Sequence, residues 1–576
     1  MTEAPPQTTG RDPKWWTLAA VLLGVFMLLL DVTIVNVALP DIQTELDASL
    51  SDLQWVIDAY ALSLAALLLT AGSLADLYGR RRVFAIGLVL FTLGSIACGA
   101  AQDILVLSIS RAFQGIGGAA MFATALALLA SAFHGRDRGI AFGAFGAVTG
   151  VAVAVGPVLG GILTTGLSWR WIFFVNIPVA LVAVVVAQTK VRESHDPRAG
   201  RPDWIGFVTF SAALGALVYG LIEAGQRSWG DDRVVWSLVA SGVLLVVFVV
   251  SQLAQKDPMF DLSLLRKPTF TGGLVAAFAV SASIFALLTY LVIYVQNVLG
   301  YNAIQTGLRF LFLSGASFVV AAVAGRLTEH IPVRWLIGPG FLILGVGLLL
   351  LLGIEDDSSW THLIPGLTVA GVGIGLINPP LASTAVGVVE VARSGMASGV
   401  NSTFRQVGIA TGIAALGSIF SHEILDSVRP ALSGKVPAQA LEPLGAALSG
   451  GQVRIAAGAA RQAADQSGGD GASAYALVQR VGTSGVVDAL NHIILIAAIG
   501  AFVAAVICLA LIRQKDFVAA GPPVAAADGE TLGKHAATPE PEPEAAVAVG
   551  GAHAAGAHAG TPHEADVPPS EDADRR

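Results

Sequence analysis

The stretch Gly72-Ser-Leu-Ala-Asp-Leu-Tyr-Gly-Arg-Arg-Arg82 places two glycines, one acid and three arginines between two apolar runs, 59–71 and 83–100. In a membrane protein, Lys and Arg residues in a short loop place that loop at the cytoplasmic face. The glycines permit a tight turn and close helix approach, and Asp76 can pair with an arginine or cap a helix end. The stretch therefore indicates either a turn that only orients its neighbouring spans or a latch between two helix bundles.

The composition predicts a protein that crosses the membrane many times. The chain has 576 residues, of which 54% are hydrophobic and 13% are charged, and its mean hydropathy is +0.71. A soluble protein carries about a quarter charged residues. The two cysteines, Cys98 and Cys508, both lie in apolar runs, so we expect buried free thiols and no disulfide.

Fourteen apolar runs are long enough to cross the membrane as helices, because about 20 residues span about 30 Å of hydrocarbon. They lack the alternating pattern of barrel strands. The predicted spans are 16–38, 53–75, 83–101, 104–133, 140–164, 171–187, 204–223, 234–254, 270–298, 305–327, 335–353, 363–389, 395–420 and 491–512.

The basic residues fix the predicted orientation, because they fall in alternate loops and at the exit of the last span, so both termini should be cytoplasmic. We expect a cytoplasmic N-terminus (1–15), a first six-helix bundle (16–188) and a linker region with two extra transmembrane helices (189–269). A second six-helix bundle (270–513) follows, with an external loop (421–490) that should form short amphipathic helices over the surface. The last segment, 514–576, is too poor in large apolar residues to fold and should be a disordered cytoplasmic tail.

The opening stretch resembles the signature loop between the second and third spans of the major facilitator superfamily. The residues that carry this resemblance, and that would form a cytoplasmic latch, are Gly72, Asp76, Gly79, Arg80 and Arg81. The family usually has a basic residue where this chain has Leu77. A weaker copy at Gly325–Arg334 shares a Gly, a Leu, an acid and an Arg at matching places, which favours two related halves.

The predicted fifth span resembles the antiporter signature of the same superfamily. Its glycines and proline are Gly156, Pro157, Gly160 and Gly161, and Ala152 stands where the family has a further Gly. A proline kinks a helix and small residues let a partner helix approach closely. The alternative is a helix that serves packing alone.

Two ionisable residues inside spans are functional candidates, because an unpaired charge in the membrane is costly. Segment 30–40, which contains Asp31 and Asn36, resembles the first-span motif of the fourteen-helix drug:proton antiporter branch. Asp31 lies roughly 20 Å along its helix at 1.5 Å per residue. It would carry a proton or contact substrate, or else form a structural pair with an arginine. Segment 111–119, with Arg111 and Gln114, resembles the family's fourth-span motif, whose Arg is implicated in proton coupling.

We expect three further polar residues to line a substrate cavity. Asp58 either lines the cavity or favours the positive end of its helix. Asn378 precedes two prolines, and the carbonyls that these free should face protein or a cavity. Arg405 lies in segment 394–408, which also resembles the fourteen-helix branch, and is interpreted as a cavity or pairing residue.

Together these features predict an all-α polytopic membrane protein with the major facilitator fold, two six-helix bundles plus two extra linking transmembrane helices. The expected function is proton-coupled export of amphipathic small molecules such as drugs, antibiotics or dyes. The alternatives are an importer or a specific metabolite or ion exchanger of the same fold, and a non-transporting membrane sensor that signals through its tail. We expect a monomer in the lipid bilayer with a small-molecule substrate and no nucleic-acid partner. We expect no cofactor and no metal, with protons as the coupling ion. The sequence contains no phosphate-binding loop and no His-Glu-x-x-His or Gly-x-Ser-x-Gly motif, so we expect no enzymatic activity.

Overall fold

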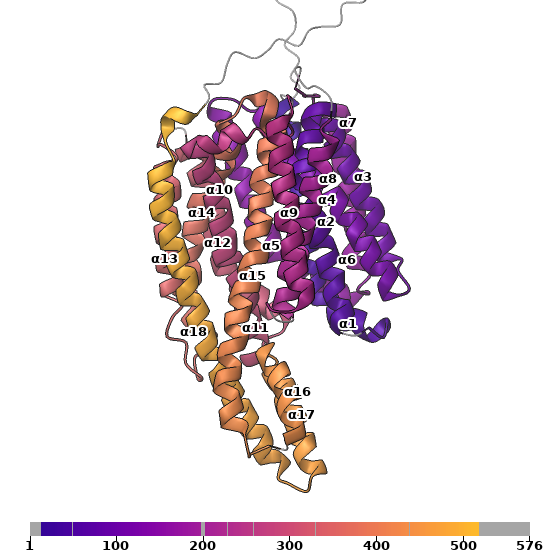
Figure 1. The fold of residues 1–576 in the computed structure, drawn as a ribbon, viewed down its shortest axis with the longest axis vertical. Coiled ribbons are helices and arrows are strands. Elements are labelled where there is room, and N and C mark those ends of the chain that lie inside the picture. Colours follow the sequence, from indigo (N-terminus) through magenta and orange to yellow (C-terminus); the bar gives the residue numbers. More distant parts are fainter. Residues whose placement is uncertain are drawn as a thin grey trace, which may run out of the picture. The chain divides into compact units, whose positions relative to one another are not determined.

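The computed structural model describes residues 13–48, 50–196, 202–226, 229–256, 258–328, 330–436 and 438–517. These residues form one compact unit, and the regular elements of its described part are all helices (Figure 1). The predicted tail and most of the predicted N-terminus lie outside the described residues.

The first half of the chain forms six long helical segments, and the last of them is interrupted at Val175 between α6 and α7. Apolar residues from α1, α2, α4 and α5 fill the core of this half, which also includes Phe84 and Phe91 of α3. The helices are α1 (Pro13–Glu45), α2 (Leu50–Tyr78), α3 (Arg80–Gly99), α4 (Ile104–Ala132), α5 (Arg136–Gly166), α6 (Trp171–Phe174) and α7 (Asn176–Lys190).

Two helices lie between the halves in the chain, α8 (Trp204–Gln226) and α9 (Asp232–Ala254). They pack on each other through Phe210 and Phe248, whose ring centroids are 5.0 Å apart. Most of the outer face of α9 is apolar and exposed, including Val243, Val246 and Val250. Such a surface belongs next to lipid, because the hydrocarbon of a bilayer is itself apolar.

The second half repeats this arrangement, but its first long helix is irregular because two π-helical segments, η2 and η3, interrupt it. The elements are η1 (Leu262–Arg266), α10 (Pro268–Val280), η2 (Ser281–Phe285), α11 (Ala286–Ile293), η3 (Tyr294–Val298), α12 (Ala303–Leu327), α13 (Arg334–Leu349), η4 (Trp360–His362), α14 (Leu363–Gly387), η5 (Val391–Arg393), α15 (Ser394–Leu432), α16 (Ala438–Ser449), α17 (Val453–Gln466), α18 (Gly471–Leu511) and η6 (Gln514–Asp516).

The two halves contact each other through a crossed pair of close helix approaches. A Cβ added to Gly72 of α2 would overlap the carbonyl of Gly395 at the start of α15. A Cβ added to Gly325 of α12 would lie 2.6 Å from the Cα of Gly143 in α5. The second helix of each half therefore lies against the fifth helix of the other, with glycine on both sides of each contact. This arrangement agrees with the weak repeat predicted at Gly325.

The chain is a multi-pass membrane protein, although the number of crossings stays a prediction. A helix is present at each of the fourteen predicted positions. Among the described residues, twelve helices are long and apolar enough to cross a membrane. The shorter α13 has 16 residues, and α5 is not one of the twelve. At 1.5 Å per residue α13 reaches only about 24 Å, short of a hydrocarbon core of about 30 Å.

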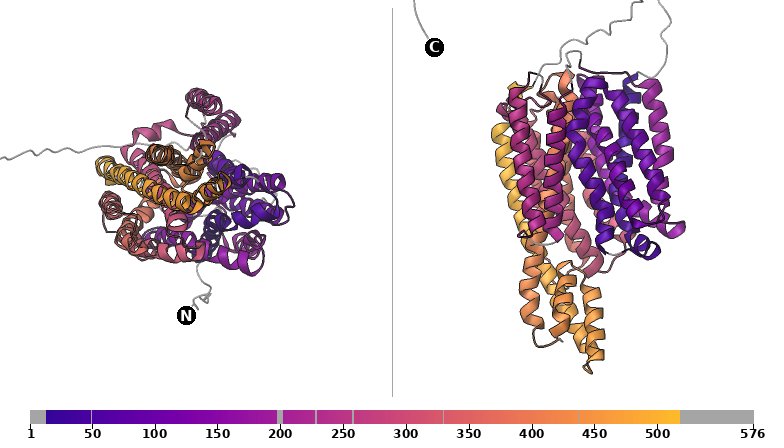
Figure 2. Two further views of the ribbon diagram at one scale, coloured as in Figure 1. Left: turned by 90° about the horizontal axis from the view of Figure 1, so that it is seen from below. Right: turned by 45° about the vertical axis from the view of Figure 1, so that its right-hand side comes forward.

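The segment predicted as an external loop differs from the expectation in one respect. The short helices α16 and α17 are present, but α15 and α18 also continue into this segment, with 39 and 41 residues respectively. Each is about 60 Å long, twice the thickness of the hydrocarbon core of a bilayer. The four helices pack together and extend away from the rest of the unit (Figures 1 and 2). Their shared core includes Ile424, Val428, Leu448 and Val478.

Candidate functional site

One end of the helical unit carries the loops rich in arginine, and we call it the basic end. The first part of the site is the contact between the halves at this end. Asp76, in the last turn of α2, is buried and accepts hydrogen bonds from the backbone N–H groups of Gly395 (2.9 Å) and Met396 (2.7 Å). Arg393 occupies the N-cap position of α15, and its side chain makes no capping hydrogen bond. A carboxylate of the first half therefore caps a helix of the second half, where the helix dipole favours a negative charge.

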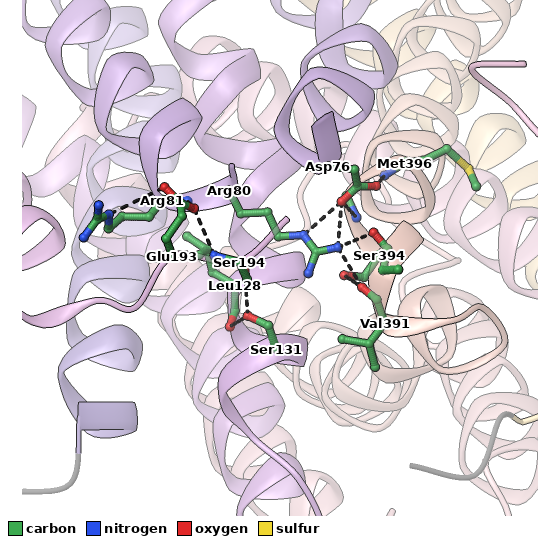
Figure 3. Close-up of polar contacts among 12 residues, drawn as sticks. Asp76, Arg80, Arg81, Leu128, Ser131, Glu193, Ser194, Val391, Ser394 and Met396 are labelled. Atoms are coloured by element: carbon green, nitrogen blue, oxygen red, sulfur yellow. Dashed lines mark hydrogen bonds and ion pairs between the residues drawn. The ribbon is translucent and has the colours of Figure 1, made fainter. Parts of the chain in front are cut away.

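Arg80 completes this contact from the first turn of α3. Its guanidinium donates to Asp76 Oδ1 from Nε (2.9 Å) and Nη2 (2.7 Å), and the Arg80 side chain is 1% exposed. Nη2 also donates to the carbonyl oxygens of Val391 (2.7 Å) and Ala392 (2.6 Å), just before α15. The two charges are thus neutralised and hydrogen-bonded while they join the halves. We call Asp76, Arg80 and residues 391–396 the latch, and Figure 3 shows it.

Two residues that the sequence assigned to this latch have another place. Arg81 makes its contacts within the first half, where its backbone N–H donates to Glu193 at 2.9 Å and its Nε lies 3.6 Å from the same carboxylate. Glu193 lies on the opposite side of Arg80 from Asp76 (Figure 3). Gly79 has a φ of 110°, a conformation that favours glycine, and it faces Glu193. These residues shape the turn from α2 to α3 and do not reach the second half.

The second part of the site is an ion pair inside the first half. Arg111 Nη1 of α4 lies 2.6 Å from Asp31 Oδ2 of α1, and both side chains are at most 2% exposed. Arg111 also donates from Nε to the carbonyl of Val56 (3.1 Å) and from Nη1 to Gln114 Oε1 (2.6 Å). The structure thus brings together Asp31, Arg111 and Gln114 as one buried group, and the predicted pairing of Asp31 with an arginine is present.

The sequence analysis missed three residues of this group. Asn176 Nδ2 donates to Asp31 Oδ1 (3.1 Å) and to Ser95 Oγ (3.2 Å), while Gln114 Nε2 donates to both of the same atoms (2.9 and 2.7 Å). The ring of Tyr60 lies under the Arg111 guanidinium, 4.2 Å from ring centroid to Cζ. Asn176 was detectable in principle, because it is an amide within an apolar run that begins Trp171-Ile-Phe-Phe-Val175.

The third part of the site is a small cavity between the halves. It is lined by polar residues of α5 and α12 and by apolar residues of the broken helix, with Asn378 of α14 at its edge. Its lining residues are Thr149, Gly150, Phe285, Leu288, Leu313, Ser314, Ser317, Ile374 and Asn378. Asn378 is 5% exposed, and its Oδ1 accepts a hydrogen bond from Arg405 Nη2 of α15 at 2.8 Å. Asn378 therefore connects the cavity to a cation.

The structure does not gather the seven predicted cavity residues into one place. Asp31, Arg111 and Gln114 are enclosed in the first half, whereas Asn378 and Arg405 lie in the second half. Asp58 is partly exposed in α2, and it is not among the residues that contact Asp31 or Arg405 in the described part of the chain. The side chains of Asn36 and Pro157 lie outside the described residues, although both positions are helical.

The glycines of the predicted antiporter helix serve close packing on two sides. A Cβ added to Gly156 would meet the Thr33 side chain of α1, and one added to Gly160 would lie 2.9 Å from Ile34 Cγ1. On the other side, a Cβ on Gly161 would lie 2.6 Å from Ile304 Cγ1 of α12. The helix α5 is therefore fitted between α1 of its own half and α12 of the other.

Comparison with known proteins agrees with these features. The model of the family described as Major Facilitator Superfamily matches residues 21–413. Over 73% of its length the chain is 39% identical to the multidrug resistance protein Stp of Mycobacterium tuberculosis, covering 78% of that protein. It is 38% identical to the puromycin resistance protein pur8 of Streptomyces alboniger, over 71% of this chain and 82% of that one. A solved human organic anion transporter, MFSD10, shares the fold with a TM-score of 0.53 and 17% identity, over 71% of this chain and 94% of that chain.

Proposed function

Because the chain belongs to the major facilitator superfamily, we propose that it is a proton-coupled exporter of amphipathic small molecules that works by alternating access. Relatives named for multidrug and antibiotic resistance support export, since the similarity to them extends over most of both chains. The superfamily consists of transporters, so the chain is a transporter and its partner is a small-molecule substrate. In the proposed orientation the basic end faces the cytoplasm of the cell, with both termini on that side.

The single observation that carries proton coupling is the buried contact between Asp31 and Arg111. Asp31 is the titratable acid of this group, and Arg111 stays charged at all relevant pH values. When Asp31 takes up a proton it becomes neutral, and its attraction to Arg111 at 2.6 Å is lost. Arg111 then has to be compensated by its remaining partners, Gln114 and the carbonyl of Val56. In the proposal this rearrangement favours one of the two conformations of the first half.

The latch stabilises one of the two conformations of the transporter, the one in which the basic end is closed. Asp76 and Arg80 join the halves only while the basic end is closed, so the contact stabilises that state alone. In an exporter the closed basic end corresponds to a transporter that has moved its substrate past the cytoplasmic side. Proton uptake at Asp31 from outside would then permit the return to the open basic end, with proton release into the cytoplasm.

Efflux from living cells tests the proposal. Cells that express the full chain are loaded with a panel of anionic, neutral and cationic fluorescent compounds and antibiotics, and the retained amount is measured with and without a protonophore. The proposal predicts faster loss of at least one compound than in vector controls, and the protonophore should abolish that difference. Increased accumulation would indicate an importer, and export that the protonophore leaves unchanged would contradict proton coupling.

A further inference from the structure

Arg405 of α15 is a partly buried cation in the membrane region, and it has no carboxylate partner among the residues that the structure describes. Its guanidinium carries five N–H donors. In the part of the chain that the structure describes, its only hydrogen bond to another side chain is the one from Nη2 to Asn378 Oδ1, and it takes part in no ion pair. By contrast, Arg111 and Arg80 each lie 2.6–2.7 Å from a buried aspartate. A charge that is left uncompensated at this depth is expensive, so its partner has to come from elsewhere.

The same helix carries further hydrogen-bond donors without partners. Ser398 Oγ, Asn401 Nδ2 and Thr403 Oγ1 are buried and make no hydrogen bond to the described residues. All three residues lie within the two turns of α15 that precede Arg405, and each is at most 4% exposed. Buried polar groups without partners are rare in native structures. Asn401 Nδ2 can only donate, and the two hydroxyls can donate as well as accept, so an acceptor could satisfy all three groups.

The membrane-spanning segments of the second half contain no carboxylate that could pair with Arg405. The sequence has no Asp or Glu in Pro268–Val298, Ile304–Leu327, Arg334–Leu349, Leu363–Gly387, 394–420 or 491–511. In the first half, Asp31 and Asp76 both have their two oxygens occupied by other partners. The lining of the cavity beside Asn378 is likewise uncharged. The charged group joined to this cavity through a lining residue is Arg405, which donates to Asn378.

From this arrangement we propose that Arg405, oriented by Asn378, binds an anionic oxygen of the substrate, so that the transporter selects weakly acidic amphipathic compounds bearing a carboxylate or phenolate over lipophilic cations. This inference deepens the proposed function and rests on it. Asn378 Oδ1 fixes one edge of the guanidinium, which leaves the other edge free to donate two parallel hydrogen bonds to a carboxylate. The apolar lining residues, such as Phe285 and Leu288, then accept the hydrophobic part of the same molecule.

Equilibrium binding of two dyes to the purified full chain tests the inference. Fluorescein, an anion at pH 8, and rhodamine 123, a cation, share a xanthene ring system and differ mainly in charge. Fluorescence anisotropy gives the dissociation constant of each for the wild type, Arg405→Gln and Arg405→Lys. Gln removes the charge but keeps an amide that can donate to Asn378, while Lys keeps the charge without the planar fork.

The wild type should bind fluorescein more tightly than rhodamine 123. Arg405→Gln should weaken fluorescein binding roughly tenfold or more, the usual effect of losing a charged hydrogen bond, and leave rhodamine 123 unchanged or tighter. Arg405→Lys should keep most of the affinity for fluorescein. The matched control is Arg309→Gln, because Arg309 is stacked on Tyr301 and Trp360, 3.5 and 4.7 Å from their ring centroids, and should leave both affinities unchanged.

Three results would overturn the inference. These are a wild type that binds no fluorescein or prefers rhodamine 123, an Arg405→Gln variant that binds fluorescein as the wild type does, and an equal loss for both dyes. The last result would show that Arg405 serves the fold. Because this assay measures binding without transport, its failure is distinct from a failure of export, which the cellular efflux assay reports.

Discussion

The carboxylate of Asp76 accepts a hydrogen bond from the backbone N–H of Met396 at 2.7 Å, across 320 residues of sequence. The contact makes the start of α15, a helix of the second half, depend on a side chain of the first half for its cap. Separation of the halves at the basic end would leave the N–H groups of Gly395 and Met396 without Asp76 and the carbonyls of Val391 and Ala392 without Arg80. Asp76 and Arg80 both belong to the first half and would stay paired. The hydrogen bonds from Gly395 and Met396 to Asp76 therefore stabilise the closed state, and a single substitution at Asp76 can weaken them.

Asp76→Asn should shift the equilibrium toward the state in which the basic end is open. The amide keeps one acceptor oxygen but loses the negative charge at the start of α15, so the closed state loses ~1–2 kcal/mol, roughly a five- to thirtyfold shift. We expect slower turnover with equal or higher affinity for substrate from the cytoplasmic side. Spin-label distances between the basic ends of α2 and α15, together with proteoliposome kinetics, measure both.

The control for this variant is Glu193→Gln. Glu193 also accepts hydrogen bonds from backbone N–H groups at a helix start, those of Arg81 and Arg82, but within the first half. It should alter stability without a change in the distance distribution. Equal effects of the two variants, or normal turnover with weakened binding in Asp76→Asn, would reduce the loop to a topological anchor.

Gly72→Ala should impair closure for a steric reason. The added Cβ would overlap the carbonyl oxygen of Gly395, so α2 and α15 have to separate. The expected outcome is a transporter that reaches the membrane in normal amounts but exports slowly. Gly315→Ala in α12 is the matched control, because a Cβ there has nothing within 4 Å. If both variants export at the wild-type rate, close packing at Gly72 is not required for the cycle.

Asp31→Asn should abolish proton coupling and also destabilise the protein. Arg111 would be left as a buried charge without its counter-ion, a loss of ~3–5 kcal/mol when one partner of a buried pair is removed. The double variant Asp31→Asn/Arg111→Gln removes both charges, so it should recover much of the thermal stability while coupling stays lost. Thermal unfolding and the pH dependence of export separate the two effects. Coupled export by the double variant would remove this pair from the mechanism.

The linker helices provide a prediction on pH. Burial alone would raise the pKa of the Asp203 carboxyl, but hydrogen bonds from Gln252, Gly206, Gln255 and Met259 outweigh it and hold the pKa below its ordinary value of 3.8. A lowered pKa in the folded state stabilises the fold above pH 3.8, and this stabilisation is lost as the pH falls through the lower value.

Asp203→Asn should therefore lower the apparent unfolding temperature at neutral pH, and the difference from the wild type should persist down to about pH 4 and shrink below it. Asp470→Asn is a suitable control, because Asp470 caps α18 at an exposed position where Asn serves equally well. A difference between wild type and Asp203→Asn that does not vary between pH 8 and pH 3 would contradict the assigned role.

Sequence patterns were sufficient for the fold and for the charged members of the site. Long apolar runs and alternate basic loops are dictated by the membrane, and Asp76 and Arg80 were found through the resemblance to the signature loop. Partners that are backbone groups leave no such trace, as with the N–H of Met396 and the carbonyl of Val391. Small polar residues such as Ser95 are common in membrane helices, so their role in the Asp31 group emerged only from the packing.

The extended helices α15 and α18 show a second limit. Hydropathy locates the part of a helix that lies in lipid, so the predicted spans stop at residue 420 and start at residue 491. Beyond the bilayer these helices are stabilised by packing on α16 and α17, for example through Val428 and Val453. That contact depends on tertiary structure, and a composition rich in Ala and Gly gives little indication of it.

Transport by the purified full chain in proteoliposomes tests the central claim most directly. Substrate movement and internal pH are recorded together after a pH gradient is imposed, for the wild type and for Asp31→Asn/Arg111→Gln. Proton-coupled export predicts that the wild type accumulates substrate against its gradient on the acidic side, that substrate addition accelerates proton flow in the opposite direction, and that the double variant does neither. Substrate movement without a matching proton flow in the wild type, or in the same direction as the protons, would contradict it.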